Sequence, residues 1–237
     1  MSLKKILIFT AVLIISLTLG MSSVNKSIDI DSGEKTDNSL SSVNGSISIG
    51  DNVSVRGSLT NVNGSIRTGS KCEVEDHVRN VNGSIRLGDN SSARKVSSVN
   101  GSIRLGKDVV IKGILKSVNG SMKCDTGTRI EGEIDTVNGS VTLYGTNVGE
   151  GISTYNGHIK LKEKSIVNGD IIIHKSKSGF IQRIFGKKKK KELRIKLSDN
   201  SVIKGDIINK DEDRDVILVL GNGCKVEGKL INIKEDK

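Results

Sequence analysis

Val43-Asn44-Gly45-Ser46-Ile47 is the stretch that decides the fold, because the same pattern recurs along the chain at a nearly fixed interval. Further copies begin at Val62, Val81, Val99, Val118, Val137 and Tyr155, and a degenerate copy begins at Val24. Successive copies are 18 or 19 residues apart. A fixed period of this length predicts a repeat architecture, in which each unit buries its apolar face only by stacking on its neighbours.

Each repeat has two halves that have the pattern of short strands. In residues 43–61 apolar residues alternate with Ser, Arg or Thr, which is typical of strands with one buried face. Twelve residues separate Val43 from Val55, and the same offset separates Tyr155 from Val167, so Val167 belongs to a second half rather than to a short repeat. Beyond the N-terminus there is no 3.6-residue apolar period that would predict a helix.

Two all-β folds could use this pattern. Asn-Gly between alternating strands also favours a hairpin, so an antiparallel meander is one alternative. A parallel β-solenoid with one repeat per coil explains the pattern better, because stacking gives each position the same neighbour type in every coil. The Asn of the repeat would then form a ladder of hydrogen-bonded amides along a corner, satisfying groups that would otherwise be buried unpaired. The ladder residues are Asn44, Asn63, Asn82, Asn100, Asn119, Asn138 and Asn156.

The pattern divides the chain into one elongated domain with a signal segment and an insertion. Residues 24–174 form the regular solenoid, residues 175–192 fit no coil, and residues 193–237 return to the pattern as C-terminal coils. Roughly ten coils are expected, which at the usual strand spacing make a rod about 45–50 Å long.

The N-terminal residues 1–23 have the character of an export signal. Lys4 and Lys5 precede an apolar run, and the small residues near Gly20 suit a cleavage site. The apolar stretch 6–20 is short for a membrane span, yet the cleavage site is not a clean Ala-x-Ala, so a signal peptide and a signal anchor both remain open. We therefore expect an exported protein of the periplasm or cell envelope, held at the membrane if the segment is not removed.

Positive charge is concentrated in the insertion. The chain carries a formal charge of +10, and the segment from Lys175 to Lys191 contains eight cations and no acid, so the remaining exported body is nearly balanced. Lysines beside apolar aromatic residues suit a segment at an anionic membrane or against an acidic envelope polymer, and a solvated loop is the alternative. Nucleic acid is disfavoured, because stacking aromatic residues are scarce. The candidate contact residues are Phe180, Arg183, Phe185, Lys187, Lys188, Lys189, Lys190 and Lys191.

The remaining reactive residues do not form a catalytic or metal-binding pattern. His77, His158 and His174 lie in different repeats without a partner at a telling spacing, and the acids are scattered. Cys72, Cys124 and Cys224 fall in non-adjacent coils, so we expect small apolar side chains along the stack rather than disulfides, with an intermolecular bridge as the alternative. We expect no enzyme activity, no metal and no cofactor.

The Val-Asn-Gly-Ser-Ile repeats and the intervening Val-x-Gly-x-Leu halves resemble the bactofilin-like polymer-forming bacterial proteins. Exported bacterial proteins with Val-Asn-Gly repeats, a late Tyr-Asn-Gly-x-Ile and a basic aromatic insertion are the more similar group, matched here by Tyr155-Asn156-Gly157-His158-Ile159 and residues 175–192. The resemblance implies a right-handed β-helix that assembles end to end. Bactofilins are typically cytoplasmic, so the export signal is a departure, and the resemblance supplies no catalytic residue.

These observations lead to an expected function. The chain is predicted to be a non-enzymatic, exported structural or scaffolding β-solenoid of the bacterial cell envelope that associates with itself through its coil ends. The alternative is an adhesin-like or ligand-binding module that uses its outward Ser, Arg and Lys side chains to bind carbohydrate or a membrane surface.

Overall fold

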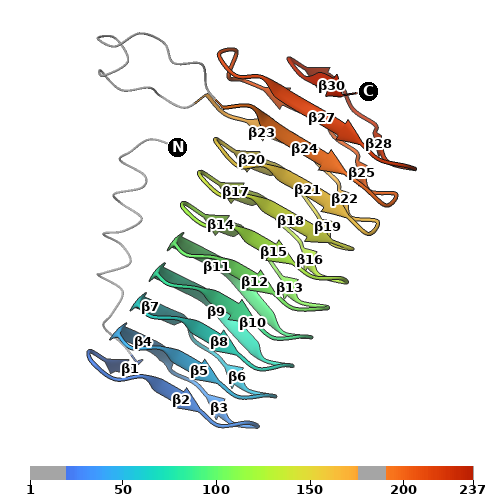
Figure 1. Ribbon diagram of the computed structural model, residues 1–237. Coiled ribbons are helices and arrows are strands. Elements are labelled where there is room, and N and C mark those ends of the chain that lie inside the picture. Colours follow the sequence, from blue (N-terminus) through green and yellow to red (C-terminus); the bar gives the residue numbers. More distant parts are fainter. Residues whose placement is uncertain (1–19, 176–190, 237) are drawn as a thin grey trace, which may run out of the picture.

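The computed structural model describes residues 20–175 and 191–236, and within these ranges the secondary structure is β-strand with no helix. The strands stack coil upon coil into a rod that runs from the N-terminal to the C-terminal coil (Figure 1). Every strand pairing is parallel, as in β5 with β8 and β24 with β27. The predicted parallel β-solenoid of about ten coils is therefore confirmed, and the antiparallel meander is excluded.

Each coil has three sides. The first side is an 11-stranded parallel sheet, here called the front face (Figure 1). Its strands are β2 (Ile28–Ile30), β5 (Ile47–Ile49), β8 (Ile66–Thr68), β10 (Ile85–Leu87), β12 (Ile103–Leu105), β15 (Met122–Cys124), β18 (Val141–Tyr144), β21 (Ile159–Lys162), β24 (Leu193–Leu197), β27 (Val216–Leu220) and β30 (Lys234–Asp236).

The other two sides together form a 19-stranded sheet, because two long strands run across the corner between them. These are β9 (Glu73–Asn82) and β11 (Ser92–Asn100). The second side contains β3 (Lys35–Thr36), β6 (Ser54–Val55), β13 (Val110–Ile111), β16 (Arg129–Ile130), β19 (Asn147–Val148), β22 (Ile166–Val167), β25 (Val202–Ile203) and β28 (Lys225–Val226). The third side contains β1 (Gly20–Ser23), β4 (Ser39–Asn44), β7 (Leu59–Asn63), β14 (Leu115–Ser117), β17 (Ile134–Thr136), β20 (Ile152–Thr154), β23 (Ile171–Ile173), β26 (Ile207–Asn209) and β29 (Leu230–Ile231).

The core runs along the axis of the rod and is built from inward columns of Ile, Leu and Val. On the front face Ile47 pairs with Ile66, which pairs with Ile85, and none of the three side chains is exposed. The period-2 alternation places every second residue of a strand in this core and the others in solvent. Followed from β2 through β3 to β4 in Figure 1, the coils wind as a right-handed helix.

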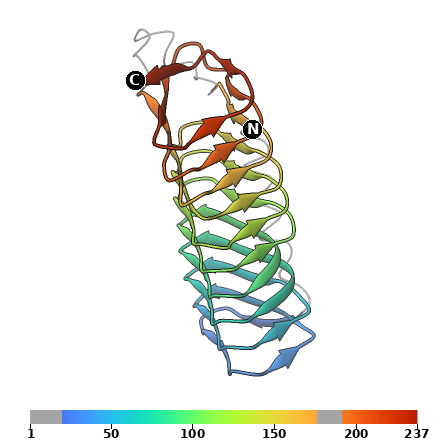
Figure 2. The ribbon, with the colours of Figure 1, turned by 90° about the vertical axis from the view of Figure 1, so that its right-hand side faces the viewer.

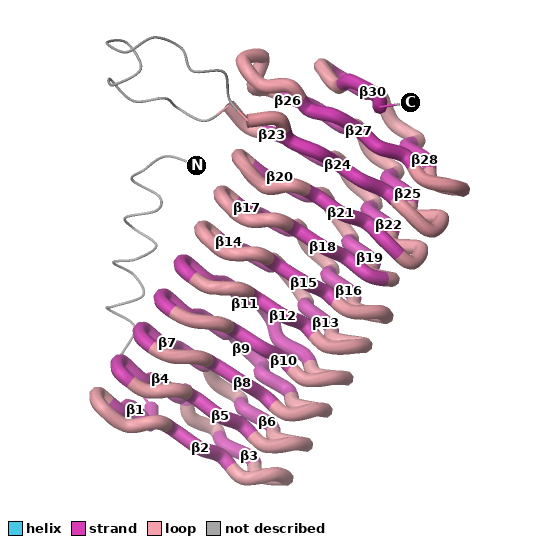
Figure 3. The backbone as a smooth tube through the Cα atoms, in the orientation of Figure 1, coloured by secondary structure: helices cyan, strands magenta, loops and turns pink. Residues whose placement is uncertain are grey.

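The register continues across the insertion. Ile159 of β21 pairs with Ile195 of β24, although the chain between β23 and β24 contains residues 176–190. Val167 lies between Val148 and Ile203 on the second side, the position that its offset from Tyr155 predicts. Figure 3 shows the strands of successive coils side by side to the C-terminal end, and Figure 2 shows the same stack from its side.

Candidate functional surfaces

An unbroken ladder of asparagine side chains runs along the corner between the third side and the front face. Each Nδ2 donates to the Oδ1 of the Asn one coil nearer the N-terminus, over 2.6–3.0 Å. The ladder contains all seven predicted residues, and Asn25 adds a rung at the N-terminal end. One expectation is wrong: the ladder side chains are exposed, so solvent reaches the groups that the sequence argument placed in the interior.

A buried arginine caps the C-terminal end of the ladder. The guanidinium of Arg214 donates to the Oδ1 of Asn156 at 2.6 Å and to the carbonyl oxygen of Tyr155 at 2.7 Å. Its Nε lies 3.9 Å from a carboxylate oxygen of the fully buried Asp211. Arg214 belongs to the turn between β26 and β27, which has no counterpart in earlier coils, so the repeat pattern gave no signal for it.

A second polar column lies inside the same corner and was missed by sequence reasoning. Asn61 and Asn80 are buried, and each Nδ2 donates to the carbonyl oxygen of a Val-Asn-Gly glycine one coil below, at 2.7 and 2.8 Å. Ser117 donates instead to the carbonyl oxygen of Gly120 at 3.0 Å. The column supports the turn from within, because it satisfies backbone carbonyls that cannot reach water.

The front face carries a column of cations on its outer surface. One outward residue of each strand from β8 to β24 pairs in register with its equivalent in the next strand, so these side chains lie in one line along the rod. The column consists of Arg67, Arg86, Arg104, Lys123, Thr142, Lys160 and Lys196. We call it the cation column. The charge count of the sequence analysis stands, since the body outside the insertion is balanced, but the register shows that cations within this balanced body form a line on one face.

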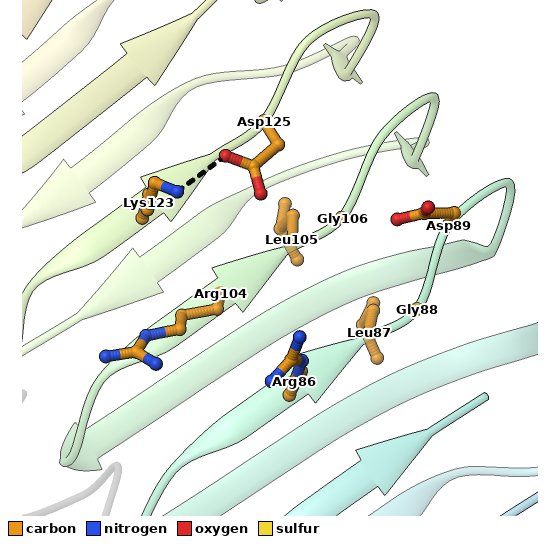
Figure 4. A pocket seen from close by; sticks show the side chains of 9 residues that line it. All are labelled: Arg86, Leu87, Gly88, Asp89, Arg104, Leu105, Gly106, Lys123 and Asp125. Carbon is orange, nitrogen blue, oxygen red and sulfur yellow. Dashed lines mark ion pairs between the residues drawn. The ribbon is translucent and has the colours of Figure 1, made fainter. Parts of the chain in front are cut away.

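A shallow groove of about 400 Å³ lies over the middle of the cation column. Arg86, Arg104 and Lys123 line it together with Asp89 and Asp125 from the turns that follow the strands (Figure 4). The Nζ of Lys123 lies 2.8 Å from a carboxylate oxygen of Asp125, and this pairing raises the pKa of Lys123. The groove therefore offers guanidinium donors on one side and carboxylate acceptors on the other.

Exposed large apolar side chains occur only in the first and last coils of the described chain. They are Val24, 61% exposed, Leu220, 41% exposed, and Ile231, 40% exposed. In the last coil Val226 and Leu230 are also only half-buried, although they pack against the core. The most exposed large apolar side chains of the described residues therefore lie in the first and last coils.

The cysteines and histidines occupy separate positions, as their spacing predicts. Cys72 and Cys124 are buried in the core and Cys224 is half-buried in the last coil, and all three are free thiols. Burial raises the pKa of the Cys124 thiol. The ring of His174 stacks on Tyr155 with centroids 5.0 Å apart, and burial lowers the pKa of its imidazole. His158 is exposed and accepts a hydrogen bond from the Arg194 backbone N–H at 3.0 Å.

Most of the predicted contact residues of the insertion lie outside the described residues. This applies to Phe180, Arg183, Phe185, Lys187, Lys188, Lys189 and Lys190, and to the predicted signal segment up to residue 19. Lys191 is exposed, and Lys175 at the other end of the insertion lies 3.3 Å from Asp213.

The described part of the chain has no group of three or more His, Cys, Asp or Glu side chains that could hold a metal ion. In the same residues no helix is long and apolar enough to span a bilayer. Comparison of the chain with protein-family models, with curated proteins and with solved structures finds no match.

Proposed function

We propose that this chain is a non-enzymatic structural element, exported to the cell envelope, that assembles end to end through the ends of its rod. The observation that carries the proposal is the confinement of exposed apolar side chains to the first and last coils, at Val24, Leu220 and Ile231. Exposed apolar side chains in the first and last coils favour contacts between the ends of rods, because association removes these side chains from water.

The strand edges support the same proposal. Within the described residues β2 pairs only with β5 at one end of the front face, and β30 pairs only with β27 at the other. An open edge presents backbone N–H and C=O groups to a further strand. A contact between two different ends does not close on itself, so it produces a filament.

Charges at the C-terminal edge limit which strands can form that contact. The outermost strand β30 carries Lys234, Glu235 and Asp236. Glu235 pairs with Leu218 and so occupies a column that holds apolar residues in the coils below. A charge in an inward column discourages pairing at an edge. We therefore assign the junction to the second and third sides, where β28 and β29 present Val226, Leu230 and Ile231.

Export and tethering complete the proposal. The export signal in residues 1–23 would place the rod in the envelope, and the basic aromatic insertion 175–192 would hold it to an anionic membrane or an acidic partner. The resemblance to bactofilin-like proteins supports assembly as the purpose of the rod. Fractionation of cells with N-terminal sequencing of the mature protein tests the export separately from the assembly.

The assembly is tested with Ile231→Lys and a matched control. Ile208 lies one coil inside Ile231 in the same outward column, so Ile208→Lys makes the same chemical change away from the end. We expect the parent and Ile208→Lys to form filaments in electron microscopy and large species in sedimentation. Ile231→Lys should shift both readouts toward single rods. A parent that stays monomeric at all protein and salt concentrations, or equal behaviour of the two variants, contradicts the proposal.

A further inference from the structure

Without a bound partner, the cation column should lower the stability of the fold. Its members stand on adjacent strands, about 4.8 Å apart, and like charges directly opposite each other in a sheet are destabilising. Four cations follow each other without interruption, from Arg67 in β8 to Lys123 in β15. Within the described residues the guanidinium groups of Arg67, Arg86 and Arg104 have no acidic partner and are exposed.

On the other sides of the rod, several cations form ion pairs with acids of a neighbouring coil. On the third side Lys116 forms an ion pair with Asp135 of the next coil. Arg56 lies 3.2 Å from Asp37, and Arg94 lies 3.6 Å from Asp76, again across coils. Stacking thus pairs opposite charges on these sides, whereas on the front face it aligns equal ones. Lys123 pairs with Asp125, but the three arginines beside it have no acidic partner among the described residues, and this indicates a partner that supplies the missing anions.

The straight, evenly spaced arrangement of the cation column suits a linear polymer. The column runs parallel to the rod axis and repeats once per strand spacing, so a chain with evenly spaced negative groups could place one group over each side chain. Arginine suits this task, because its guanidinium binds a carboxylate or phosphate through two parallel hydrogen bonds. A chain of uronic acid sugars has one carboxylate per ring, and the length of one ring along such a chain is comparable to the strand spacing.

The neighbours of the column favour a sugar polymer over other polyanions. Ser65 and Ser84 lie two residues before Arg67 and Arg86, on the same outward side, and their hydroxyls are 3.2 Å apart. Asp89 and Asp125 flank the groove on the other side (Figure 4). Hydroxyls and carboxylates can exchange hydrogen bonds with sugar hydroxyls, which a polyphosphate lacks, whereas the two Asp carboxylates repel the anionic groups of either polymer equally.

A nucleic acid fits less well. Tyr144 is the aromatic residue beside the column, and its ring is covered by the ammonium groups of Lys123 at 5.0 Å and Lys162 at 5.3 Å. Among the described residues the front face therefore has no row of rings on which successive bases could stack. We propose that the front face of the rod binds a linear acidic polysaccharide of the polyuronate class, whose carboxylates lie along Arg67, Arg86, Arg104 and Lys123.

The test compares two double variants of the full chain. Arg86→Ala with Arg104→Ala removes two neighbouring members of the cation column. Arg56→Ala with Arg94→Ala removes two exposed arginines from another side and changes the net charge equally. Binding to fluorescent polygalacturonate is followed by anisotropy over a range of salt concentrations, with dextran as the neutral polymer and sodium polyphosphate as the second polyanion. Circular dichroism checks that each variant is folded.

We expect the parent to bind polygalacturonate and not dextran, with an affinity that falls as salt rises. Loss of two surface cations should weaken binding about tenfold or more in the column variant and flatten its salt dependence. The control variant should retain the parent affinity to within about twofold. Equal losses in both variants, absence of binding at low salt, or tighter binding of polyphosphate would each overturn the proposal. The assay reads binding by single rods as well as by filaments, so it is independent of end-to-end assembly.

Discussion

Replacing one glycine at the Val-Asn-Gly corner should destabilise the whole rod, and Gly101→Ala is the sharpest case. A Cβ on Gly101 would point directly at the carbonyl oxygen of Gly83 in the coil below and lie 2.5 Å from its carbonyl carbon. Favourable contacts between such atoms begin near about 3.5 Å. The obstacle is backbone, so no side chain can move aside, and the two coils must separate at this corner.

The size of the effect follows from what the separation breaks. The Gly83 N–H donates to the carbonyl oxygen of Asn100 at 3.0 Å, and the Asn100 side chain donates to Asn82 at 3.0 Å. Two neutral hydrogen bonds contribute about 1–3 kcal/mol together. Overpacking a tight contact costs about 1–3 kcal/mol more. We therefore expect Gly101→Ala to lower the free energy of unfolding by about 4 kcal/mol, a large part of the ~5–15 kcal/mol typical of a domain.

Gly113→Ala is the matched control, because Gly113 lies in the same coil and neither glycine has a positive φ. Its Cβ would lie 3.1 Å from the nearest atom, the carbonyl oxygen of Arg94, and otherwise meet the flexible side chain of Lys95. A cost below about 1 kcal/mol is expected, since alanine also restricts the unfolded chain. Urea unfolding followed by circular dichroism measures both variants. A difference of less than about 1 kcal/mol between them would refute the argument that the corner needs glycine for close approach of coils.

Two further predictions concern buried groups. Arg214→Met should lower the free energy of unfolding by about 3–5 kcal/mol, because it removes the guanidinium that faces the buried carboxylate of Asp211. Amide hydrogen exchange should then accelerate in β27 and β30 but not in β5, while the exposed neighbour Lys210→Met should change neither; uniform acceleration along the rod would contradict the assignment of Arg214 as a local cap. Burial raises the pKa of the Cys124 thiol, so the folded state binds its proton more tightly than the unfolded state does. The resulting stability is complete below the unfolded pKa of about 8.5 and is lost as pH rises above it. Urea midpoints should therefore fall between pH 8 and pH 10 more steeply in the parent than in Cys124→Ala, and parallel pH profiles would exclude this linkage.

The coil could be predicted from the sequence because stacking requires the same residue type at each position where successive coils pack tightly. Asn44 and its copies bond to one another, and glycine is needed wherever a corner carbonyl lies below it, so these positions repeat almost without change. The same constraint allowed the position of Val167 within its coil to be predicted from the sequence, because the equivalent position on the second side is apolar in the neighbouring coils.

The cation column was missed because outward positions carry no such constraint. Arg67, Lys123 and Thr142 occupy equivalent positions but are different residues, so they do not stand out as a repeat. Counting charges also conceals them, because acids elsewhere on the rod balance the sum. The register shows that several of these acids pair with bases on the other sides. The Arg214 cap was missed for a different reason: its turn occurs once, and nothing in the local sequence indicates that a buried Asp211 lies beside it.

The front face carries positive charge along its middle and negative charge at its two ends. Asp29 in β2 and Asp236 in β30 occupy the column's line in the first and last coils, so the line of cations ends before the rod does. In a filament each junction would therefore bring acids together on the front face and interrupt the positive line. A polysaccharide chain bound along one rod would meet repulsion at the next junction. If the rods assemble and bind polysaccharide as proposed, the front face would hold separate polymer segments on successive rods, while the second and third sides would join the rods to each other.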